Sequence, residues 1–547
     1  MQSVEQFLLS DNWKQFDHPV DFVTFFMLIC LHCDRYCLRA ILVLLGDMPM
    51  PLNETETLAD SSRPISVMIN SISYEVSDIR PDTTLLQFLR LHRGLCGTKE
   101  GCAEGDCGAC TVVLGRERGG QIFYQPVNAC ITLLPMVDKA VIRTVEGVER
   151  EDGTLHPVQQ ALVDHHGSQC GFCTPGFVMS LFAGWLNGHS FTGAELDDLL
   201  SGNLCRCTGY GPIVRAAESL AHHSIQPWEY ERISNEKRFI ENCKDLPALS
   251  YDVGGCFYVA PDSIDGVSMA YFTQPDAQIV AGATDIGVWI NKQNKKISKF
   301  ISIQDVPDIS KVTESDDGFF IGASTTHQEA AKRLSLSFAD MGELWRRFGS
   351  VQVRSNGTVG GNIANGSPIG DLAPALIALN TKLHLRCGEK KRQVDLENFF
   401  ITYGKQDRQV AEWVEGLFVP RLSEGWHFNC HKLSRRFDQD ISSVMGAFAL
   451  QIYDGVIQEA RVVFGGMAAI PKRATSLENE LIGQPLRPKK VDEDWIDNAL
   501  KTDFTPLSDV RASNTYRLLA ARNLLQKCRL ELATGVTIRL AENEPLH

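Results

Sequence analysis

The chain has 547 residues and a formal net charge of −14 at pH 7, from 53 Lys and Arg against 67 Asp and Glu. At roughly 150 residues per domain, this length predicts three or four domains. The acidic balance argues against a nucleic-acid-binding protein, which needs a basic surface. The sequence has no run of about 18 apolar residues, so we expect no membrane-spanning helix.

Cysteine is the most informative residue type in the composition. The chain has 17 cysteines, an odd number that fits a disulfide framework poorly in a sequence of this length. The cysteines also fall in clusters, which in a large chain usually indicates metal or redox chemistry. We therefore expect a reducing, cytoplasmic location.

Residues 1–62 differ from the rest and form an N-terminal extension of unknown role. They show no basic start and no small-residue cleavage site, so a signal peptide is not expected. Cys30, Cys33 and Cys37 would share one face of a helix, where a metal site is conceivable. The plainer interpretations are a half-buried apolar helix or upstream sequence read in from a wrong start codon, with a polar tether after it.

Residues 63–147 have the pattern of a small sheet domain. Apolar residues alternate over 65–69 and again over 72–76, which predicts two strands joined by a turn at Asn70-Ser71. A helix is predicted over 83–90. The cysteines that follow lie in a glycine-rich loop, and glycines let a backbone wrap closely around a bound group.

The spacing of these cysteines predicts a [2Fe–2S] cluster. Cys102, Cys107 and Cys110 have the x4 and x2 spacing of plant-type ferredoxins, and Cys130 is the distant fourth thiolate. Zinc is the alternative, although zinc sites usually use paired C-x2–4-C knuckles. We interpret Cys96, just outside the loop, as a bystander.

Residues 148–225 are predicted to form four short helices, a small bundle. Thr192-x-x-Glu195 is a capping box for the third helix. Two cysteine pairs, Cys170 with Cys173 and Cys205 with Cys207, lie at helix junctions, where they can meet in space. Four thiolates there would bind either zinc or a second [2Fe–2S] cluster.

The next segments are predicted to form a polar, irregular linker over 226–256 and a mixed α+β domain over 257–425. Residues 279–287 read as a strand, a tight glycine turn and a helix start. Residues 354–371 form a second glycine-rich loop. Such loops present backbone N–H groups to phosphates, so the two together would grip an extended dinucleotide. The loop over 279–287 matches neither a Rossmann fingerprint nor a Walker loop.

The flanks of the second cysteine module are more specific than its spacing. Gln169-Cys-Gly-Phe-Cys-Thr-Pro-Gly176 and Gly202-Asn-Leu-Cys-Arg-Cys-Thr-Gly-Tyr210, placed after the first module, resemble the iron–sulfur region of the molybdenum hydroxylases. That family includes xanthine dehydrogenase, aldehyde oxidase and carbon monoxide dehydrogenase. The resemblance implies two [2Fe–2S] clusters, one near a molybdopterin cofactor and the other near a flavin.

The resemblance also implies a multidomain α+β fold. Its parts are a β-grasp ferredoxin-like domain, a four-helix iron–sulfur domain, an α+β FAD-binding domain and an α/β C-terminal flavoprotein domain over 426–535, before a tail over 536–547. Asp371 would accept from a ribose or adenine donor, and Lys432 would be a cation near the flavin. The implied FAD contacts are Val280, Ala281, Gly282, Ala283, Thr284, Asp285, Ile286, Gly287, Phe348, Thr358, Val359, Gly360, Gly361, Asn362, Asp371, Val414 and Lys432.

A molybdopterin domain is missing from this sequence, so the resemblance implies that it lies on a separate large subunit. The fused iron–sulfur and flavin parts are similar to the small subunits of bacterial xanthine dehydrogenases. That similarity implies a heterotetramer of two small and two large subunits. It also implies that electrons pass from purine hydroxylation to FAD and then to NAD+. We expect no catalytic acid or base in this chain.

Three alternatives stay open at this point. The first is the equivalent subunit of another molybdenum hydroxylase, acting on an aldehyde or an N-heterocycle. The second is a reductase that runs electrons from NAD(P)H in the opposite direction. The third is a zinc-binding structural protein with a degenerate nucleotide-like domain. The sequence does not distinguish NAD+ from oxygen as the final acceptor.

Overall fold

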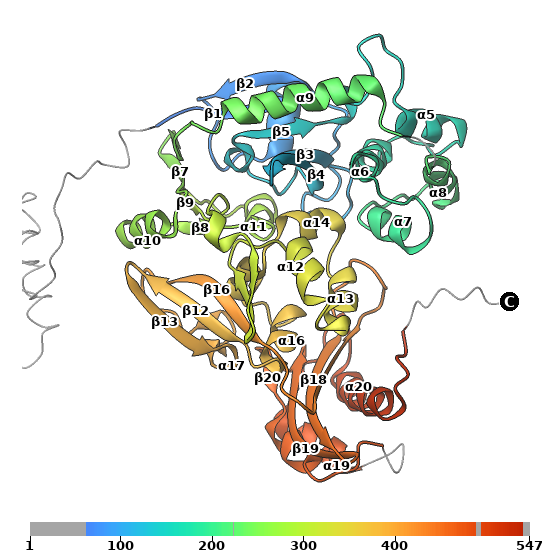
Figure 1. The fold of residues 1–547 in the computed structure, drawn as a ribbon, viewed down its shortest axis with the longest axis vertical. Helices are drawn as coiled ribbons and strands as arrows, with labels where there is room; N and C mark the ends of the chain where they lie inside the picture. The colour runs from blue at the N-terminus through green and yellow to red at the C-terminus, as the bar shows by residue number, and fades with distance from the viewer. Residues whose placement is uncertain (1–61, 222–223, 488–493, 540–547) are drawn as a thin grey trace, which may run out of the picture. The chain divides into compact units, whose positions relative to one another are not determined.

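The computed structural model describes residues 62–221, 224–487 and 494–539 (Figure 1). The predictions for residues 1–61 and for 540–547 lie outside these ranges. Within the described part of the chain, no helix is both long enough and apolar enough to cross a membrane.

The first region, residues 63–147, is built on a five-stranded sheet in the order β2-β1-β5-β3-β4. Its strands are β1 (Ile65–Ile69), β2 (Ile72–Val76), β3 (Thr111–Arg118), β4 (Gln121–Asn128) and β5 (Ala140–Arg143). β1 pairs with β5 in parallel, and the other neighbours pair antiparallel. The predicted turn is confirmed, since Asn70 and Ser71 both have positive φ, 48° and 68°.

The helix predicted over 83–90 is also confirmed. It comprises α4 (Leu85–Gln87) and the short π-helix η2 (Phe88–His92). The Thr84 side chain accepts from the Gln87 N–H, and the Gln87 side chain accepts from the Thr84 N–H. This reciprocal cap fixes where the helix begins.

The second region contains the four predicted helices α5 (Pro157–Asp164), α6 (Thr174–Leu186), α7 (Gly193–Leu200) and α8 (Gly211–Glu218). α6 is the central one, and all its residues from Gly176 to Trp185 are buried. The capping box at Thr192 is wrong. Thr192 precedes α7, but its hydroxyl shares a hydrogen bond with Ser190 and makes no cap.

The stretch 226–256, expected to be an irregular linker, is mostly regular structure. It holds α9 (Pro227–Asn242), then β6 (Leu249–Val253) and the start of β7 (Cys256–Ala260). α9 lies along the first sheet and contacts β3, β4 and β5 (Figure 1). The prediction failed because α9 buries charged side chains, so no apolar stripe marks it as a packed helix.

Those charged side chains form a buried network with Arg143 of β5. Glu229 and Glu236 of α9 are 0% and 1% exposed. Glu229 lies 2.5 Å from Arg143 Nη1, and Glu236 lies 2.6 Å from Arg143 Nε. The Tyr124 hydroxyl donates to Glu236. Burial raises the pKa of Glu229. One guanidinium therefore compensates two carboxylates in the interior.

Replacing Arg143 with Met should lower the free energy of unfolding by about 3–5 kcal/mol, because two buried carboxylates would lose their counter-charge. Urea unfolding followed by tryptophan fluorescence measures the change. Arg232→Met is the matched control on α9. Arg232 is half-buried and donates to the backbone carbonyls of Gly147 and Glu149, so about 1 kcal/mol is expected there. Equal losses in the two variants would contradict the assignment.

The third region has two sheets with helices between and around them. One sheet has the order β6-β7-β9-β8, with β8 (Gln278–Val280) and β9 (Lys299–Ser302). The other has the order β10-β11-β16-β12-β13, with β10 (Val312–Glu314), β11 (Gly318–Gly322), β12 (Lys382–Cys387), β13 (Lys390–Asp395) and β16 (Trp413–Pro420). A hairpin of β14 (Phe400–Thr402) and β15 (Lys405–Gln406) follows α17 (Leu396–Phe399).

The helices of this region position the predicted glycine loops. They are α10 (Ile264–Thr273), α11 (Ile286–Gln293), α12 (His327–Leu334), α13 (Ala339–Arg346), α14 (Val351–Asn356), α15 (Val359–Asn365) and α16 (Leu372–Ala378). The strand, glycine turn and helix expected over 279–287 are confirmed as β8, a loop and α11. The second glycine-rich loop contains α15 and ends at α16.

The first and third regions share one hydrophobic core. Ile65 and Val67 of β1 belong to the same buried cluster as Tyr251, Tyr258 and Phe300 of the third region. The Tyr251 hydroxyl donates to the Ile79 carbonyl at 2.7 Å. The two sheets therefore pack as a continuous apolar unit.

The C-terminal region is an antiparallel sheet in the order β17-β18-β19-β20, with helices packed on it. The strands are β17 (Trp426–Leu433), β18 (Val444–Tyr453), β19 (Val456–Gly465) and β20 (Lys472–Arg473), and the helices are α18 (Thr475–Leu481), α19 (Asp494–Asp503) and α20 (Asn514–Thr534). α20 packs on β17 and β18, and α16 of the third region packs on β18 and β19 (Figure 1).

A buried carboxylate ties α20 to β17. Glu531 is 4% exposed, and its two oxygens lie 3.3 Å from His431 Nε2 and 3.0 Å from Lys527 Nζ. Burial alone would raise the pKa of Glu531. The contact with His431, the Ile538 N–H and the Lys527 ammonium outweigh burial and lower the pKa from 4.5 to about 2.

Glu531→Gln should destabilise the protein above pH 4.5, and its deficit should shrink as the pH falls from 4.5 toward about 2. The sign follows because the unfolded chain takes up this proton at a higher pH than the folded chain. Urea midpoints of wild type and variant, compared at each pH, measure the difference. Glu459→Gln, at an exposed position of β19, is the control. A pH dependence common to both variants would contradict the prediction.

Candidate functional site

The first cysteine set comes together as predicted from the loop before β3 and the end of β4. The Cys102 thiol interacts with those of Cys107 and Cys130, and the Cys130 thiol interacts with that of Cys110. The contacts with Cys107 and Cys130 lower the pKa of the Cys102 thiol and raise those of its two partners. The four sulfurs therefore share one site.

Backbone N–H groups point at this site. Those of Glu104, Asp106 and Cys107 lie 3.5, 3.3 and 3.4 Å from Cys102 Sγ. Donors to sulfur stabilise thiolates and tune the potential of an iron–sulfur cluster. The donor set of four thiols with amide donors fits a [2Fe–2S] cluster. Cys96 is exposed, and its carbonyl accepts from Arg90 and Lys99.

The second cysteine set also comes together, between α5 and α6 and before α8. Cys170 Sγ lies 3.6 Å from Cys207 Sγ, and the Cys173 and Cys205 thiols interact with each other. Burial raises the pKa of Cys173 to about 12. The Thr208 N–H lies 3.5 Å from Cys205 Sγ. Here again the thiols and an amide donor fit an iron–sulfur cluster.

The two sets differ in depth. Cys110 and Cys130 of the first set are buried, whereas Cys170 and Cys207 of the second are exposed.

In the described ranges, no group of three or more His, Cys, Asp or Glu side chains is arranged to hold a single metal ion.

A cavity of about 900 Å³ lies between the two predicted glycine loops. Fourteen of the predicted FAD contacts line it: Ala281, Gly282, Ala283, Thr284, Asp285, Ile286, Phe348, Thr358, Gly360, Gly361, Asn362, Asp371, Val414 and Lys432. The other three do not. Val280 and Val359 are core residues at 0% exposure, and Gly287 packs against Ile131 of the first region.

The two glycine loops touch directly. The Asn356 side chain donates to the Gly282 carbonyl at 3.1 Å, and a Cβ on Gly282 would lie 1.9 Å from the Asn356 carbonyl oxygen. Only glycine fits at this approach. The Thr358 hydroxyl accepts from the Gly361 N–H and caps α15. A cavity of this size with two glycine loops in its wall fits a dinucleotide.

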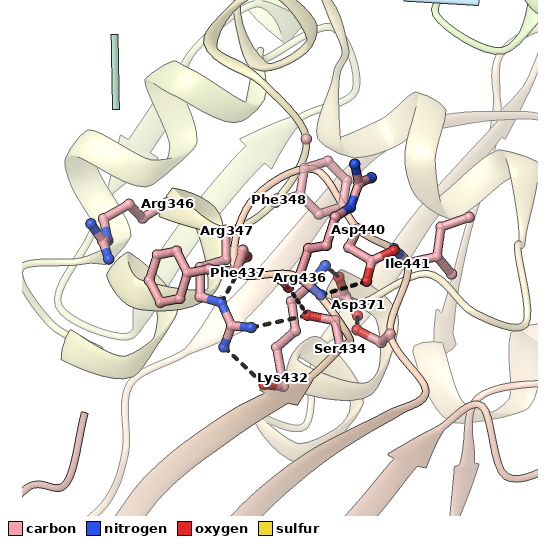
Figure 2. Close-up of polar contacts among 12 residues, drawn as sticks. Arg346, Arg347, Phe348, Asp371, Lys432, Ser434, Arg436, Phe437, Asp440 and Ile441 are labelled. Atoms are coloured by element: carbon pink, nitrogen blue, oxygen red, sulfur yellow. Dashed lines mark hydrogen bonds and ion pairs between the residues drawn. The ribbon is translucent and has the colours of Figure 1, made fainter. Parts of the chain in front are cut away.

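Asp371 and Lys432 form a buried ion pair in the cavity wall, with Lys432 Nζ 2.6 Å from Asp371 Oδ2 (Figure 2). The Ser442 hydroxyl donates to the other carboxylate oxygen. In this structure the carboxylate expected to accept from a ribose or adenine is therefore engaged by Lys432 and Ser442. The Asp371 carboxylate in turn orients the Lys432 ammonium group in the cavity.

A loop over 434–441 borders the same cavity through Gln439, Asp440 and Ile441. Arg347 holds this loop. Its guanidinium donates to the Lys432 carbonyl at 2.8 Å, to the Ser434 hydroxyl at 3.0 Å and to the Phe437 carbonyl at 3.2 Å (Figure 2). The Gln439 side chain donates to the Ser201 carbonyl of the second region.

Sequence reasoning missed several residues of the cavity wall. They include His327, Tyr271, Trp289, the β14–β15 hairpin, and the segment Glu104 to Asp106 from the first cysteine loop. His327 is buried, and desolvation lowers its pKa to about 3, so it is neutral. None of these residues belongs to either of the two glycine loops that were predicted to bind the dinucleotide. The placement of Glu104 to Asp106 brings the first cysteine set next to the cavity.

Comparison with known families decides what these sites belong to. Residues 67–134 match the family "2Fe-2S iron-sulfur cluster binding domain", and residues 144–218 match "[2Fe-2S] binding domain". Residues 250–422 match "FAD binding domain in molybdopterin dehydrogenase", and residues 429–532 match "CO dehydrogenase flavoprotein C-terminal domain". The chain belongs to the molybdenum hydroxylase family. The four-part α+β fold class predicted above is confirmed.

Several curated members of this family resemble the chain in sequence. Xanthine dehydrogenase/oxidase of Rattus norvegicus is 30% identical over 480 residues, which cover 78% of this chain and 35% of that protein. The Gallus gallus enzyme is 28% identical over 489 residues, covering 76% and 36%. The chain thus spans about a third of the length of these relatives.

Solved structures in the family align with about half of the chain. Quinoline 2-oxidoreductase from Pseudomonas putida 86 is 22% identical, covers 51% of this chain and 98% of its own, and has a TM-score of 0.46. A Cu,Mo-CO dehydrogenase is 24% identical, covers 49% and 94%, and has the same TM-score of 0.46.

Cys102→Ser should remove one [2Fe–2S] cluster and so reduce bound iron by about half, because the variant lacks one of four thiolate ligands. Iron and acid-labile sulfide per chain measure the loss. Cys96→Ser is the matched control and should retain all the iron. Full iron in Cys102→Ser would contradict the assignment of the first set.

Gly282→Ala should lower flavin content, because the new Cβ would lie 1.9 Å from the Asn356 carbonyl oxygen and force the glycine loops apart. The ratio of released flavin to protein measures the effect. Gly211→Ala is the control, since the nearest atom to its Cβ is the flexible end of Arg215 at 3.4 Å. Equal flavin content in the two variants would count against the cavity as the flavin site.

Proposed function

We propose that the chain is the electron-relay subunit of a xanthine dehydrogenase. Purine hydroxylation at the molybdopterin centre of a large partner subunit would supply the electrons, and NAD+ would receive them. Bound [2Fe–2S] clusters carry one electron each and bound FAD carries two, so the chain would join a two-electron oxidation to a two-electron acceptor. The residues of the chain set the order and spacing of these groups.

The order of the three sites carries this proposal. Cys170 and Cys207 of the second set are exposed, whereas the first set lies deeper. The first set adjoins the cavity through Glu104 to Asp106. Asn291 of α11 braces that junction, since its side chain donates to the Ala103 and Cys130 carbonyls at 3.1 and 2.6 Å. The sites therefore form a series from the surface to the cavity.

The surface beside the second set supports docking of a partner there. Phe172, Leu204 and Tyr210 lie within three residues of Cys170 or Cys207 in the chain and are 47%, 39% and 38% exposed. Exposed apolar side chains that cluster beside a functional group are typical of a protein interface. We propose that the large molybdopterin-binding subunit covers this surface, in a heterotetramer of two small and two large subunits.

The choice of xanthine rests on the sequence relatives, which are named xanthine dehydrogenase or xanthine dehydrogenase/oxidase and are about 30% identical. The choice of NAD+ rests on the resemblance to bacterial xanthine dehydrogenases noted in the sequence. Location in the cytoplasm is supported by the thiols. All fourteen cysteines in the described ranges are free, as expected in a reducing compartment.

The test uses the chain co-purified with its natural partner. Xanthine is added without oxygen, the visible spectrum is followed, and NAD+ is then added. We expect the iron–sulfur and flavin absorbance to bleach with xanthine and to return with NAD+.

Other outcomes would change the proposal in defined ways. Coloured protein that stays oxidised with xanthine but bleaches with an aldehyde or an N-heterocycle would reassign the substrate. Colourless protein containing zinc would overturn the relay itself. Recovery with oxygen and not with NAD+ would change the acceptor.

A further inference from the structure

The loops that carry the two cysteine sets touch through their backbones. The Leu204 N–H, next to Cys205 of the second set, donates to the Cys107 carbonyl of the first set at 3.0 Å. The backbone of Cys107 in the first set is thus one hydrogen bond away from Leu204, which is covalently bonded to Cys205 of the second set.

A buried polar cluster fixes this contact, and its members come from three regions. They are Thr111 of β3, Ser180 of α6, Asn203 beside the second cysteine set and Gln352 of α14, all at most 2% exposed. The Asn203 amide donates to the Gly108 carbonyl at 3.2 Å. Its carbonyl oxygen accepts from the Ser180 hydroxyl at 2.6 Å and from the Gln352 amide at 3.1 Å.

Gln352 brings the third region into this junction. Its amide nitrogen also lies 3.1 Å from Ser180 Oγ and 3.3 Å from Thr111 Oγ1. α14 packs on β4 beside the cluster (Figure 1). Asn203 therefore contacts the first cysteine loop directly, and Gln352 braces it from the region that holds the cavity.

The contact leaves no room for adjustment. A Cβ on Gly108 would lie 2.1 Å from the Gly202 carbonyl oxygen, and a Cβ on Gly176 would lie 2.3 Å from the Gly108 carbonyl oxygen. Gly108 has a φ of +69°, which favours glycine. The two loops approach as closely as backbones can, so a shift at Asn203 moves one cysteine set against the other.

We propose that Asn203, braced by Gln352, is a positioning residue for electron transfer between the two cysteine sets, acting through the Leu204 N–H to Cys107 carbonyl hydrogen bond. This inference rests on the proposed relay function. With both clusters bound, one electron would leave the reduced cluster of one set and reduce the oxidised cluster of the other. No bond forms or breaks, and no further reactant is needed.

The test uses the full chain with its partner, loaded with iron and flavin. Flash photoreduction with a soluble deazaflavin delivers fewer electrons than there are molecules, and absorbance follows their redistribution. Electron paramagnetic resonance of the dithionite-reduced protein reports the magnetic interaction between the two clusters. Neither readout depends on turnover.

Asn203→Ala should slow the redistribution several-fold, because the two cysteine-bearing loops would lose the side chain that holds them together, and should weaken the magnetic interaction. Gln352→Met should give a smaller effect of the same kind. Asn187→Ala is the matched control. Asn187 also ties the second region to the first sheet, donating to the Tyr124 carbonyl at 2.6 Å, but at the far end of α6 from the cysteines. It should change neither readout.

An unchanged rate and an unchanged magnetic interaction in Asn203→Ala, at full iron content, would overturn the inference while the relay itself stands. If Asn203→Ala loses iron, Gln352→Met decides, because Gln352 lies outside both cysteine loops: a slower redistribution supports the inference, and an unchanged one overturns it. Wild-type protein without two distinct cluster signals would show instead that the proposed function is wrong.

Discussion

The close approach of two cysteine-bearing loops is the constraint on which the rest of the structure depends. Gly108 and Gly176 meet where any side chain would collide with a carbonyl oxygen. The first sheet, the helical region and α14 meet at this point. The first sheet and α14 each supply one buried polar side chain, Thr111 and Gln352, and the helical region supplies Ser180 and Asn203. The low polarity of the surroundings makes those hydrogen bonds strong and costly to leave unmade. Backbone contacts thus fix the relative position of the two cysteine sets.

Elsewhere in the molecule, buried ion pairs fix how neighbouring elements are placed against one another. Arg143 holds α9 on the first sheet, Lys432 and Asp371 join the C-terminal region to the cavity wall, and Glu531 joins α20 to β17. Desolvation offsets much of the attraction in such pairs, so they add little net stability. Their directional contacts allow few alternative arrangements of the elements that they connect.

Much of the fold followed from local patterns. Cysteine spacing located both sulfur sites, and apolar periodicity found the first strands and the helices around the second set. The failures share a cause. α9 was missed because its buried face is charged, and Thr192 was misjudged because Ser190 competes for its hydroxyl. The wall formed by Glu104 to Asp106 and His327 depends on packing between regions, which no local pattern encodes.

The single core shared by the first and third regions has a consequence for how the chain evolves and folds. Neither region can be cut out without exposing the apolar faces that Tyr251, Tyr258 and Phe300 now cover, so the two should unfold as one cooperative unit. A mutation deep in the flavin-side sheet would then loosen the sulfur site across the boundary. Folding cooperativity and the placement of the first cysteine set beside the cavity therefore depend on the same interface, so a mutation there would affect both.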